Sequence, residues 1–361
     1  STRYAYDEMG NKVAQTDAEG RITSWQYDAM GREIARTLPG GQRETKAYNA
    51  AGELTAHTDF NGDTTRYRYT AGGYLEHTDY PNDADVSFQY NGAGERTQVQ
   101  DGRGTSTTAY DRRGRMIRSV DADGGIIEYQ YDAVGNLIAR ISPSQSLVYS
   151  HDARNRMASV TRTVDGEAPA TTTYEYDQVG NRTAMTTGGV RNEYSYDRRH
   201  RLSSLIKRTA AGALLLAMNY SLDASGMRTG VEEADASGIV RSVAYAYDAT
   251  KRLISETIDH RDDANDRIGQ WTYDRVGNRL SQSVAIAAVS PQATSYAYDA
   301  NDRLLSESGA VSASYSYDAQ GNTLGKQDAS GATTYAYNDA NRLIEAITPH
   351  AALAYAYTAD G

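Results

Sequence analysis

Aromatic and polar residues alternate along the chain in short segments, and the same segment recurs from one end to the other. Tyr-Asp-x-x-Gly, or a close variant, begins at seventeen positions from Tyr6 to Tyr357. Successive copies are 19 to 21 residues apart, except for five spacings of 25 or 26 residues between His151 and Tyr298. This regular self-similarity indicates a repeat architecture, in which each copy is one supersecondary unit.

The Tyr-Asp-x-x-Gly segment predicts a turn, named here the lead turn. Asp follows the lead residue in twelve copies, Asn in three and Thr in two, and Gly closes twelve copies. An Asp that opens a type I turn, followed three residues later by a left-handed residue, is a common hairpin connection. Four of the five other closing residues belong to types that tolerate positive φ, so we expect a left-handed backbone at this position. The five residues are Asn155, His200, Lys251, Asp302 and Asn341.

Each lead turn is flanked by two predicted strands. The residue two positions before the lead residue is aromatic in fifteen of the seventeen copies, and residues i and i+2 of a strand share a face. A second segment, such as residues 252–257, mixes β-branched and polar residues and ends in another turn. Examples of these return turns are residues 17–20 and 121–124. Each repeat is therefore predicted to form one hairpin.

Together the repeats predict an all-β fold. About 17 hairpins would form a continuous antiparallel meander of roughly 34 strands, and a twisted sheet of that size must coil into a β-spiral, tube or shell. We expect a single repeat array over residues 1–361, with short repeats in 1–150, longer hairpins in about 151–298 and short repeats in 299–361. The first and last copies resemble interior ones, so we expect the array to be a fragment of a longer chain.

Composition changes this picture in one respect. Leu, Ile, Val and Phe total 52 of 361 residues, or 14%, whereas Tyr alone contributes 29. The rings of Tyr must therefore supply most of the packing. A net charge of -10 argues against nucleic acid as a partner, and the absence of Cys excludes disulfides and thiolate catalysis. The longest apolar run, residues 210–218, is too short to span a membrane.

The candidate chemistry is structural. The repeated Asp could form a ladder of catalytic or calcium-binding carboxylates, but its replacement by Asn or Thr suits a turn cap better. The acidic loop at residues 260–266 lacks the Gly and spacing of an EF-hand, which favours a solvated hairpin tip over a calcium site. We predict no catalytic, cofactor or metal site. The predicted structural residues are Tyr6, Asp7, Gly10, Tyr27, Asp28, Gly31, Tyr131, Asp132, Gly135, Tyr176, Asp177, Gly180, Tyr273, Asp274, Gly277, Tyr317, Asp318 and Gly321.

The copies at residues 131–137, 176–182 and 273–279 carry the sequence Tyr-Asp-x-Val-Gly-Asn. They resemble the YD-repeat, or Rhs-repeat, family, which includes bacterial Rhs proteins, the C component of Tc toxins, wall-associated YD proteins and teneurins. The resemblance implies a β-sheet spiral that forms a hollow shell, often around a toxic C-terminal domain, whereas teneurins use the scaffold in adhesion. The self-cleaving members carry an Asp-Pro-containing motif, and no Asp-Pro dipeptide occurs here. Self-cleavage is therefore not predicted.

The leading hypothesis is a non-catalytic scaffold, part of a shell that encapsulates or presents a toxin or effector cargo. Its partners would be other segments of the same shell or the enclosed polypeptide. The alternative is an extracellular adhesion or fibre module that binds glycan, protein or its own open edge strands. Neither hypothesis involves nucleic acid or a membrane span, and both place the protein outside a bacterial cell or on its surface.

Overall fold

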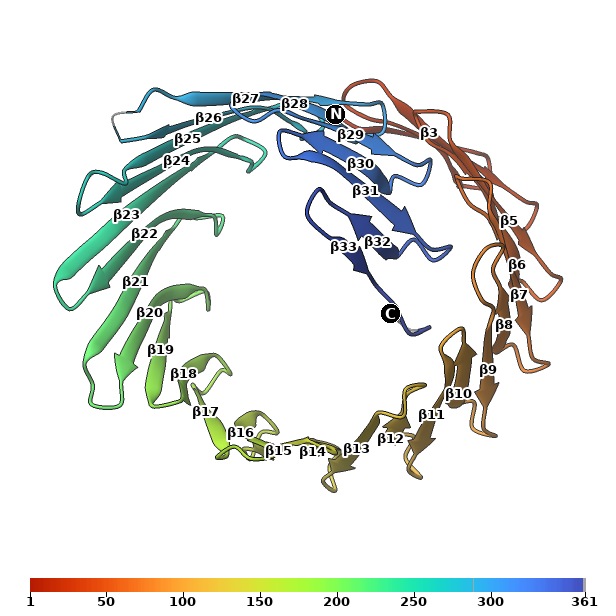
Figure 1. Cartoon of the computed structure of the whole chain (residues 1–361), viewed down its shortest axis with the longest axis horizontal. Coiled ribbons are helices and arrows are strands. Elements are labelled where there is room, and N and C mark those ends of the chain that lie inside the picture. The colour runs from red at the N-terminus through yellow and green to blue at the C-terminus, as the bar shows by residue number, and fades with distance from the viewer. Residues whose placement is uncertain (288, 360–361) are drawn as a thin grey trace. The chain divides into compact units, whose positions relative to one another are not determined.

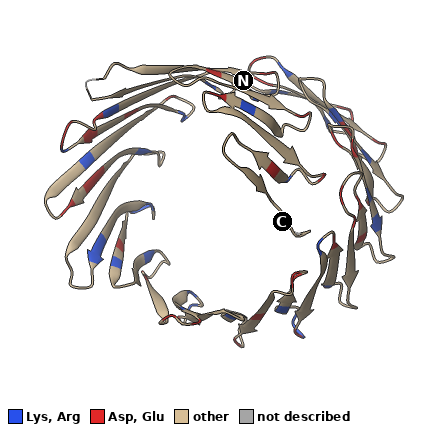
Figure 2. Ribbon diagram, viewed as in Figure 1, with Lys and Arg blue, Asp and Glu red and all other residues tan. Residues whose placement is uncertain are grey.

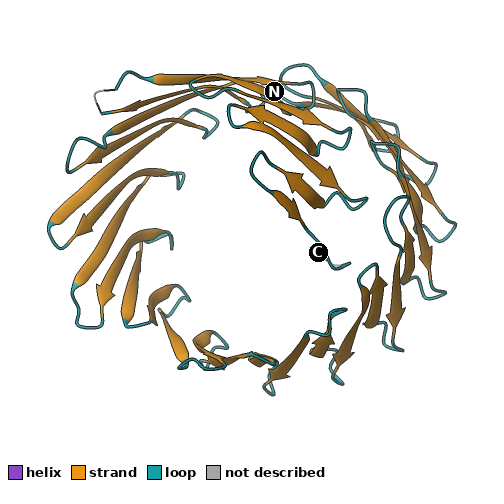
Figure 3. Ribbon diagram, in the orientation of Figure 1, coloured by secondary structure: helices purple, strands orange, loops and turns teal. Residues whose placement is uncertain are grey.

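Strands make up the regular secondary structure of this protein. The computed structural model describes residues 1–287 and 289–359, which form 33 strands and no helix (Figures 1 and 3). The predicted all-β fold is confirmed, with nearly the expected number of strands. The described residues also contain no helix with the length and apolar character needed to cross a bilayer.

The strands belong to one sheet and follow each other along the chain, as labelled in Figure 1. Their bounds are β1 (Arg3–Tyr6), β2 (Lys12–Thr16), β3 (Ile22–Tyr27), β4 (Glu33–Thr37), β5 (Arg43–Tyr48), β6 (Leu54–Thr58), β7 (Thr64–Tyr69), β8 (Leu75–Asp79), β9 (Val86–Tyr90), β10 (Arg96–Asp101), β11 (Gly104–Tyr110), β12 (Met116–Val120), β13 (Ile126–Tyr131), β14 (Leu137–Ser142), β15 (Gln145–His151), β16 (Met157–Val164), β17 (Ala170–Tyr176), β18 (Arg182–Thr187), β19 (Val190–Tyr196), β20 (Leu202–Thr209), β21 (Leu214–Leu222), β22 (Arg228–Asp235), β23 (Gly238–Tyr247), β24 (Leu253–His260), β25 (Arg267–Tyr273), β26 (Arg279–Ile286), β27 (Gln292–Tyr298), β28 (Leu304–Gly309), β29 (Ala313–Tyr317), β30 (Thr323–Asp328), β31 (Gly331–Tyr337), β32 (Leu343–Ile347) and β33 (Ala352–Ala354).

Consecutive strands pair in antiparallel orientation, with a register shift beside the lead turns. In the pair β1 and β2, Ala5 lies opposite Ala14, but Tyr6 lies opposite Lys12. The same one-residue shift occurs between β3 and β4 and between β17 and β18. A bulge of this kind is expected where a left-handed residue closes a hairpin turn. The predicted meander is therefore confirmed, with its register set at the lead turns.

The lead turns share one backbone geometry. In the first, the N–H of Gly10 donates to the carbonyl oxygen of Asp7 at 3.1 Å, and φ at Gly10 is 85°. The five closing residues that are not Gly all have φ between 57° and 67°, so the predicted left-handed conformation is confirmed. Gly361, which closes the seventeenth copy, lies outside the described residues.

The two faces of the sheet differ in exposure. In β13, Tyr129 and Tyr131 are half-buried, whereas the alternating Glu128 and Gln130 are exposed. Among the described residues, no large side chain is fully buried, and the most buried residues are small, such as Ala184 at 1% exposure. The strands lie in a single sheet, so there is little interior in which a large side chain can be enclosed. The contacts that stabilise the fold must therefore join neighbouring hairpins.

Strand length follows the repeat spacing. Strands β1 to β10 have four to six residues, whereas β20 to β24 have eight to ten. Because side chains alternate with a period of two, adding two residues to each strand leaves the facing of every side chain unchanged. Tyr245 and Tyr247 of the ten-residue strand β23 accordingly stay half-buried, with the exposed Ala246 between them.

The chain divides into two compact units. The first comprises Ser1–Thr107, Thr272–Gln282 and Ala293–Gly361, and the second comprises Thr108–Trp271 and Ser283–Gln292. Within the first unit, turns near the start of the chain contact turns near its end, as when Arg21 pairs with Asp302 at 2.7 Å. The sheet turns back on itself in this unit, and the predicted coiling is confirmed.

Replacing Lys251 with Gly is expected to stabilise the protein. Lys251 has φ of 67°, where a Cβ costs about 1–2 kcal/mol, offset in part by the greater freedom of Gly in the unfolded chain. We expect the free energy of unfolding to rise by about 0.5–1 kcal/mol. Urea denaturation followed by circular dichroism measures the change.

Gly226→Ala is the matched control for this substitution. Gly226 closes the preceding lead turn with φ of 93°, so a Cβ there should lower the free energy of unfolding by about 1 kcal/mol. A Lys251→Gly variant that is less stable than the wild type would contradict the assignment of strain to this position.

Candidate functional site: the turns that join neighbouring hairpins

The Asp residues of the lead turns cap their own turns. Oδ1 of Asp7 accepts hydrogen bonds from the N–H groups of Met9 at 3.0 Å and Asn11 at 2.8 Å. The second of these bonds, from the N–H four residues after the Asp, recurs at 2.8–3.0 Å at Asp28, Asp132, Asp177, Asp274 and Asp318. Each carboxylate thus satisfies backbone donors that the turn would otherwise leave to solvent.

The closing glycines complete these turns. Their φ angles lie between 75° and 112°, a region that other residues rarely adopt. The glycines in question are Gly10, Gly31, Gly135, Gly180, Gly277 and Gly321.

The Tyr residues of the lead turns contact the preceding hairpin. The hydroxyl of Tyr131 donates to the carbonyl oxygen of Met116 at 2.9 Å, fifteen residues earlier. Burial raises the pKa of Tyr317, which keeps its hydroxyl protonated as a donor to Leu304. Tyr27 and Tyr176 make the same bond at 2.9 Å. Tyr6 ends β1 and is 60% exposed, and Tyr273 ends β25.

An arginine that the sequence analysis overlooked extends the contact to the next hairpin. Nε of Arg32, four residues after Asp28, donates to Oδ2 of Asp28 at 2.7 Å. One terminal nitrogen of Arg32 donates to the carbonyl oxygen of Asn49, in the next lead turn, at 3.0 Å. The guanidinium also lies 4.8 Å from the ring centroid of Tyr48, a favourable cation–π arrangement. The same three contacts occur at Arg115, Arg156 and Arg303.

A signal for this residue was present in the sequence. The position four residues after the lead Asp is Arg in seven copies and Asn in five. Where it is Asn, as at Asn136, the side-chain amide donates to Oδ2 of the same turn's Asp at 2.9 Å. The column is visible in the repeats, but the groups that Arg reaches in the next hairpin are not.

In two lead turns, the donor and the acceptor of the side-chain hydrogen bond between the lead-turn Asp and the residue four positions later are exchanged. Asn49 and Asn91 stand where other copies have Asp, and each is followed four residues later by Glu. The side-chain amide of the Asn donates to the Glu carboxylate at 2.6 Å in both turns. Asn338 departs from this pattern, because the residue four positions later is Arg342 and not Glu. Nε of Arg342 is buried and has no hydrogen-bond partner among the described residues.

These contacts keep the turn carboxylates ionised. The side chain of Arg156, followed by its backbone N–H, lowers the pKa of Asp152 from 3.8 to about 2. The side chain of Arg115 lowers the pKa of Asp111, and the N–H of Arg32 lowers that of Asp28. A carboxylate with a lowered pKa is a permanent hydrogen-bond acceptor near neutral pH rather than a proton donor. The turn carboxylates are therefore suited to structure and not to acid catalysis.

In the first unit, return turns from the start of the chain contact lead turns that come 256 to 261 residues later. In four of these contacts, a side-chain oxygen of the return turn accepts the N–H of the residue directly after the lead Asp, Asn or Thr. The four are Glu19 with Arg275 at 3.1 Å, Asn61 with Ala319 at 2.9 Å, Asp83 with Asp339 at 2.7 Å, and Asp101 with Ala359 at 2.9 Å.

The fifth contact uses the side chain of Asn301. Its Oδ1 accepts the N–H of Gly40 at 2.9 Å, and its Nδ2 donates to Gln42 at 2.8 Å. We refer to the five contacts together as the seam. The seam joins the edges of two overlapping parts of the sheet through side chains.

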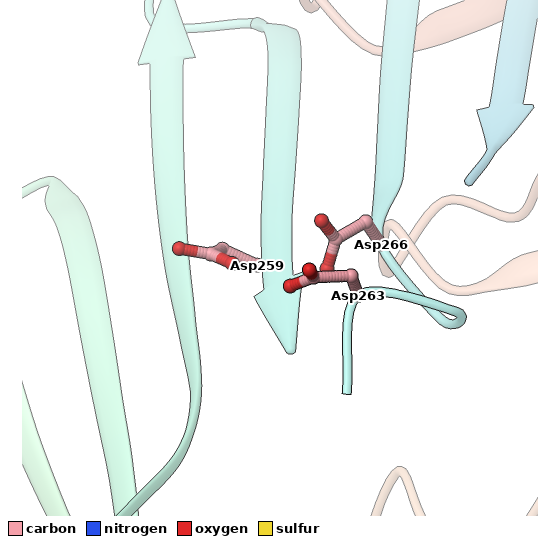
Figure 4. Close-up of side chains that lie close together, drawn as sticks. All are labelled: Asp259, Asp263 and Asp266. Carbon is pink, nitrogen blue, oxygen red and sulfur yellow. The ribbon is translucent and has the colours of Figure 1, made fainter. Parts of the chain in front are cut away.

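One acidic cluster lies apart from the lead turns. The carboxylates of Asp259, Asp263 and Asp266 bring oxygen atoms within 4.8 Å of one another (Figure 4). Asp259 belongs to β24, and the other two lie in the loop before β25. Oδ1 of Asp266 accepts the N–H of His260 at 2.7 Å, so this carboxylate shapes the loop. Since the loop also lacks the sequence of an EF-hand, we assign the cluster to the hairpin tip.

Comparison with protein families identifies the repeats. The RHS Repeat family model matches residues 13–43, 48–85, 110–147 and 131–168. The Teneurin YD-shell model matches residues 235–361. The chain belongs to the YD-repeat, or Rhs-repeat, family. The family and its fold are those of structural shell proteins.

Solved structures share the fold of this YD-repeat chain. The TcdB2–TccC3 complex is 16% identical, with a TM-score of 0.77 over 96% of this chain and 22% of that one. The TcdB2–TccC3–Cdc42 complex is 15% identical, with the same TM-score and coverage. A Tc holotoxin pore of Photorhabdus luminescens is 15% identical, with a TM-score of 0.77 over 96% of this chain and 21% of that one. The YD-repeat chain thus spans about a fifth of the solved chains it matches, and no curated protein matches it.

Replacing Asn338 with Asp should stabilise the YD-repeat fold. An Asp would offer Oδ2 to the buried Nε of Arg342, which has no hydrogen-bond partner among the described residues. A hydrogen bond between charged groups that satisfies a buried donor contributes about 1–2 kcal/mol. We expect the free energy of unfolding at pH 7 to rise by about that amount, measured by urea denaturation.

Asn49→Asp is the matched control, with the opposite expected sign. It removes the amide that donates to Glu53 at 2.6 Å and places two carboxylates together. We expect destabilisation of about 1–2 kcal/mol. Equal effects of the two substitutions would refute the donor and acceptor pairing described above.

The lead-turn carboxylates should make the YD-repeat fold sensitive to acid. The pKa of Asp152 is about 2 in the folded protein against an ordinary value of 3.8. A lowered folded pKa gives stability that is complete above the unfolded value and is lost as the pH falls through the folded one. We expect the urea midpoint to fall between pH 3.8 and about 2.

The Asp152→Asn variant isolates one carboxylate of the set. Its urea midpoint should be lower than that of the wild type at pH 7 and should fall less steeply in acid, as followed by circular dichroism. Asp165→Asn is the control, because Asp165 is an exposed residue of a return turn. An Asp152→Asn profile that parallels the wild type throughout would contradict the prediction.

Proposed function

We propose that this chain is a wall segment of a β-sheet shell that shelters a polypeptide cargo and has no catalytic activity of its own. Family membership and the fold shared with the TcdB2–TccC3 complexes support this function. Because the chain spans about a fifth of those solved chains, it would form part of a larger shell. The proposed setting is outside a bacterial cell or on its surface.

The seam is the observation that carries the proposal. A wall built from a coiled sheet excludes proteins from its interior only if overlapping parts of the sheet are held together along their edges. In the first unit, five successive return turns each bind a lead turn through a side chain. The bonds recur at five successive hairpins rather than at one point, as closure along an edge requires.

The links between hairpins support the same function. Each Arg that binds its own turn, the next turn and the next Tyr ring restrains the angle between neighbouring hairpins. Such restraint would keep a thin sheet curved without a packed core beneath it. The volume that such a sheet encloses would then be available to another polypeptide.

Self-association through edge strands is the second candidate function, and one observation favours it. All four residues of β1 and all three of β33 are exposed. Exposed edge strands can pair with another chain and form fibres. Adhesion to glycan would be a further use of such an assembly.

Opening the seam should expose the cargo to protease. In the full-length shell protein, we expect the enclosed polypeptide to resist trypsin under native conditions. The double variant Asn61→Ala and Asp83→Ala removes two seam acceptors. We expect trypsin to cleave the cargo at least about tenfold faster in this variant, as followed by mass spectrometry of the fragments. A tenfold change corresponds to a loss of about 1.4 kcal/mol in the free energy that keeps the seam closed.

Asn219→Ala serves as the control, because Asn219 is an exposed strand residue outside the seam. This variant should protect the cargo as well as the wild type does. Rapid cleavage of the cargo in the wild-type protein would refute the shell function, and fibres that assemble without any protected segment would favour the second candidate.

A further inference from the structure

Five lead turns close on a residue other than Gly, and four of these residues are hydrogen-bonded to the preceding lead turn. In each case the partner is the side-chain amide of an Asn that lies four residues after the lead Asp of that preceding turn. We name this contact the closing-residue link. The pairs are Asn136 with Asn155 at 3.0 Å, Asn181 with His200 at 3.0 Å, Asn322 with Asn341 at 2.8 Å, and Asn278 with Asp302.

His200 differs chemically from the other three closing residues. Of the four, only His200 belongs to a residue type that ordinarily changes charge between pH 5 and 8. Its Nδ1 lies 3.0 Å from Nδ2 of Asn181. The φ angle is 61° at His200, against 60° at Asn155 and 57° at Asn341. The imidazole nitrogen therefore occupies the place that a side-chain oxygen takes in the other links, on the same left-handed backbone.

The neighbouring Asp177 fixes which atom of this pair donates. Nδ2 of Asn181 also donates to Oδ2 of Asp177 at 2.7 Å, and an ionised carboxylate can only accept. Desolvation raises the pKa of Asp177, but hydrogen bonds from Asn181 and from other N–H groups of the turn outweigh it, so the pKa is lowered. Turning the amide over would place Oδ1 of Asn181 against this carboxylate. Nδ2 therefore donates in both bonds, and Nδ1 of His200 is the acceptor, with the ring proton on Nε2.

Protonation of the His200 ring removes this acceptor. An imidazolium carries a proton on both nitrogens, so Nδ1 can no longer receive the amide of Asn181. If the amide turned over and accepted a proton from the ring, it would lose its bond to Asp177 instead. In either arrangement, one of the two hydrogen bonds of Asn181 is lost when the ring becomes charged.

The charged groups around His200 do not compensate for this loss. Among the described residues, no carboxylate is bound to the ring, and Oδ2 of Asp197 is held by Nε of Arg201 at 2.7 Å. Lys and Arg, blue in Figure 2, recur at hairpin tips between β15 and β24. A proton on His200 thus adds positive charge to a turn that already carries three Arg. The charged residues of this lead turn and of its two neighbours are Asp177, Asp197, Arg198, Arg199, Arg201 and Asp223.

We propose that His200 is a proton-sensitive link between two neighbouring hairpins, formed when its imidazole is neutral and lost when the imidazole is charged. The links to Asn155 and Asn341 persist over the same pH range, because an amide oxygen does not titrate. Acidification from pH 8 to 5 therefore loosens the sheet at one place, between the lead turns at residues 177–181 and 197–201. This inference rests on contacts within one part of the sheet and holds whether or not the sheet encloses a cargo.

The ring nitrogens of His200 give a direct test. Nuclear magnetic resonance of protein labelled with ¹⁵N-histidine distinguishes the two neutral tautomers from the imidazolium, and the signal that is missing in the His200→Asn variant belongs to His200. We expect the proton on Nε2 at pH 8 and protons on both nitrogens at pH 5. A proton on Nδ1 at pH 8, or a ring that stays neutral at pH 5, would overturn the proposal.

His200→Asn is also the matched variant for stability, because Asn accepts the same amide with positive φ at positions 155 and 341. Urea denaturation followed by circular dichroism compares the two proteins at pH 8 and pH 5. The folding equilibrium constant of the wild type should fall at least about fivefold relative to that of the variant, as the loss of one hydrogen bond predicts. The other His residues are common to both proteins, so their titration cancels in the comparison.

Removing the donor shows whether the link itself causes the difference. In the Asn181→Ala background, adding His200→Asn should change the pH dependence of folding by less than about twofold, because the link is already absent. A relative stability of wild type and His200→Asn that does not change with pH would refute the proposal. A fivefold change that persists in the Asn181→Ala background would assign the effect to repulsion from the neighbouring Arg residues and overturn the link.

Discussion

The hydrogen bond between a lead-turn Asp and the Arg or Asn four residues later is the contact on which the rest of this structure depends. The described strands lie in one sheet, and the most buried residues are as small as Ala35 and Ala184. An ordinary apolar core therefore contributes little. The Asp fixes the turn and orients the Arg, which then reaches the carbonyl oxygen and the Tyr ring of the following hairpin. One polar group thereby connects local turn geometry with the packing of one repeat against the next.

The two kinds of turn have different tasks. Lead turns hold the sheet together along its length, because Arg reaches the next repeat and Tyr donates to the preceding one. Among the described residues, the return turns do not share such links from repeat to repeat, and their side chains vary. In the first unit, that freedom supplies the Glu, Asn and Asp oxygens of the seam. Constancy on one edge and variation on the other suit a coiled sheet whose overlapping parts meet in one register only.

Much of the fold could be predicted because its determinants are local. The period of the repeats, the hairpin turns and the left-handed closing residues all follow from residues a few positions apart. Even the departures from Gly, such as His200 and Lys251, have the predicted positive φ. The arginines were overlooked because their role is not local. Arg32 forms one bond within its own turn and another with a residue seventeen positions later, and only the second shows how hairpins are joined.

By itself, the sequence determined the hairpins, their order in the sheet and the sharing of one face by the two aromatic residues before each lead turn, because short turns join consecutive strands and side chains alternate with a period of two. Only the tertiary structure decided which return turn meets which lead turn. Asn61 and Ala319 are 258 residues apart, and they come together because small rotations between neighbouring strands add up over many hairpins. The total rotation depends on every strand between the two residues, so no local sequence pattern around either residue predicts their contact.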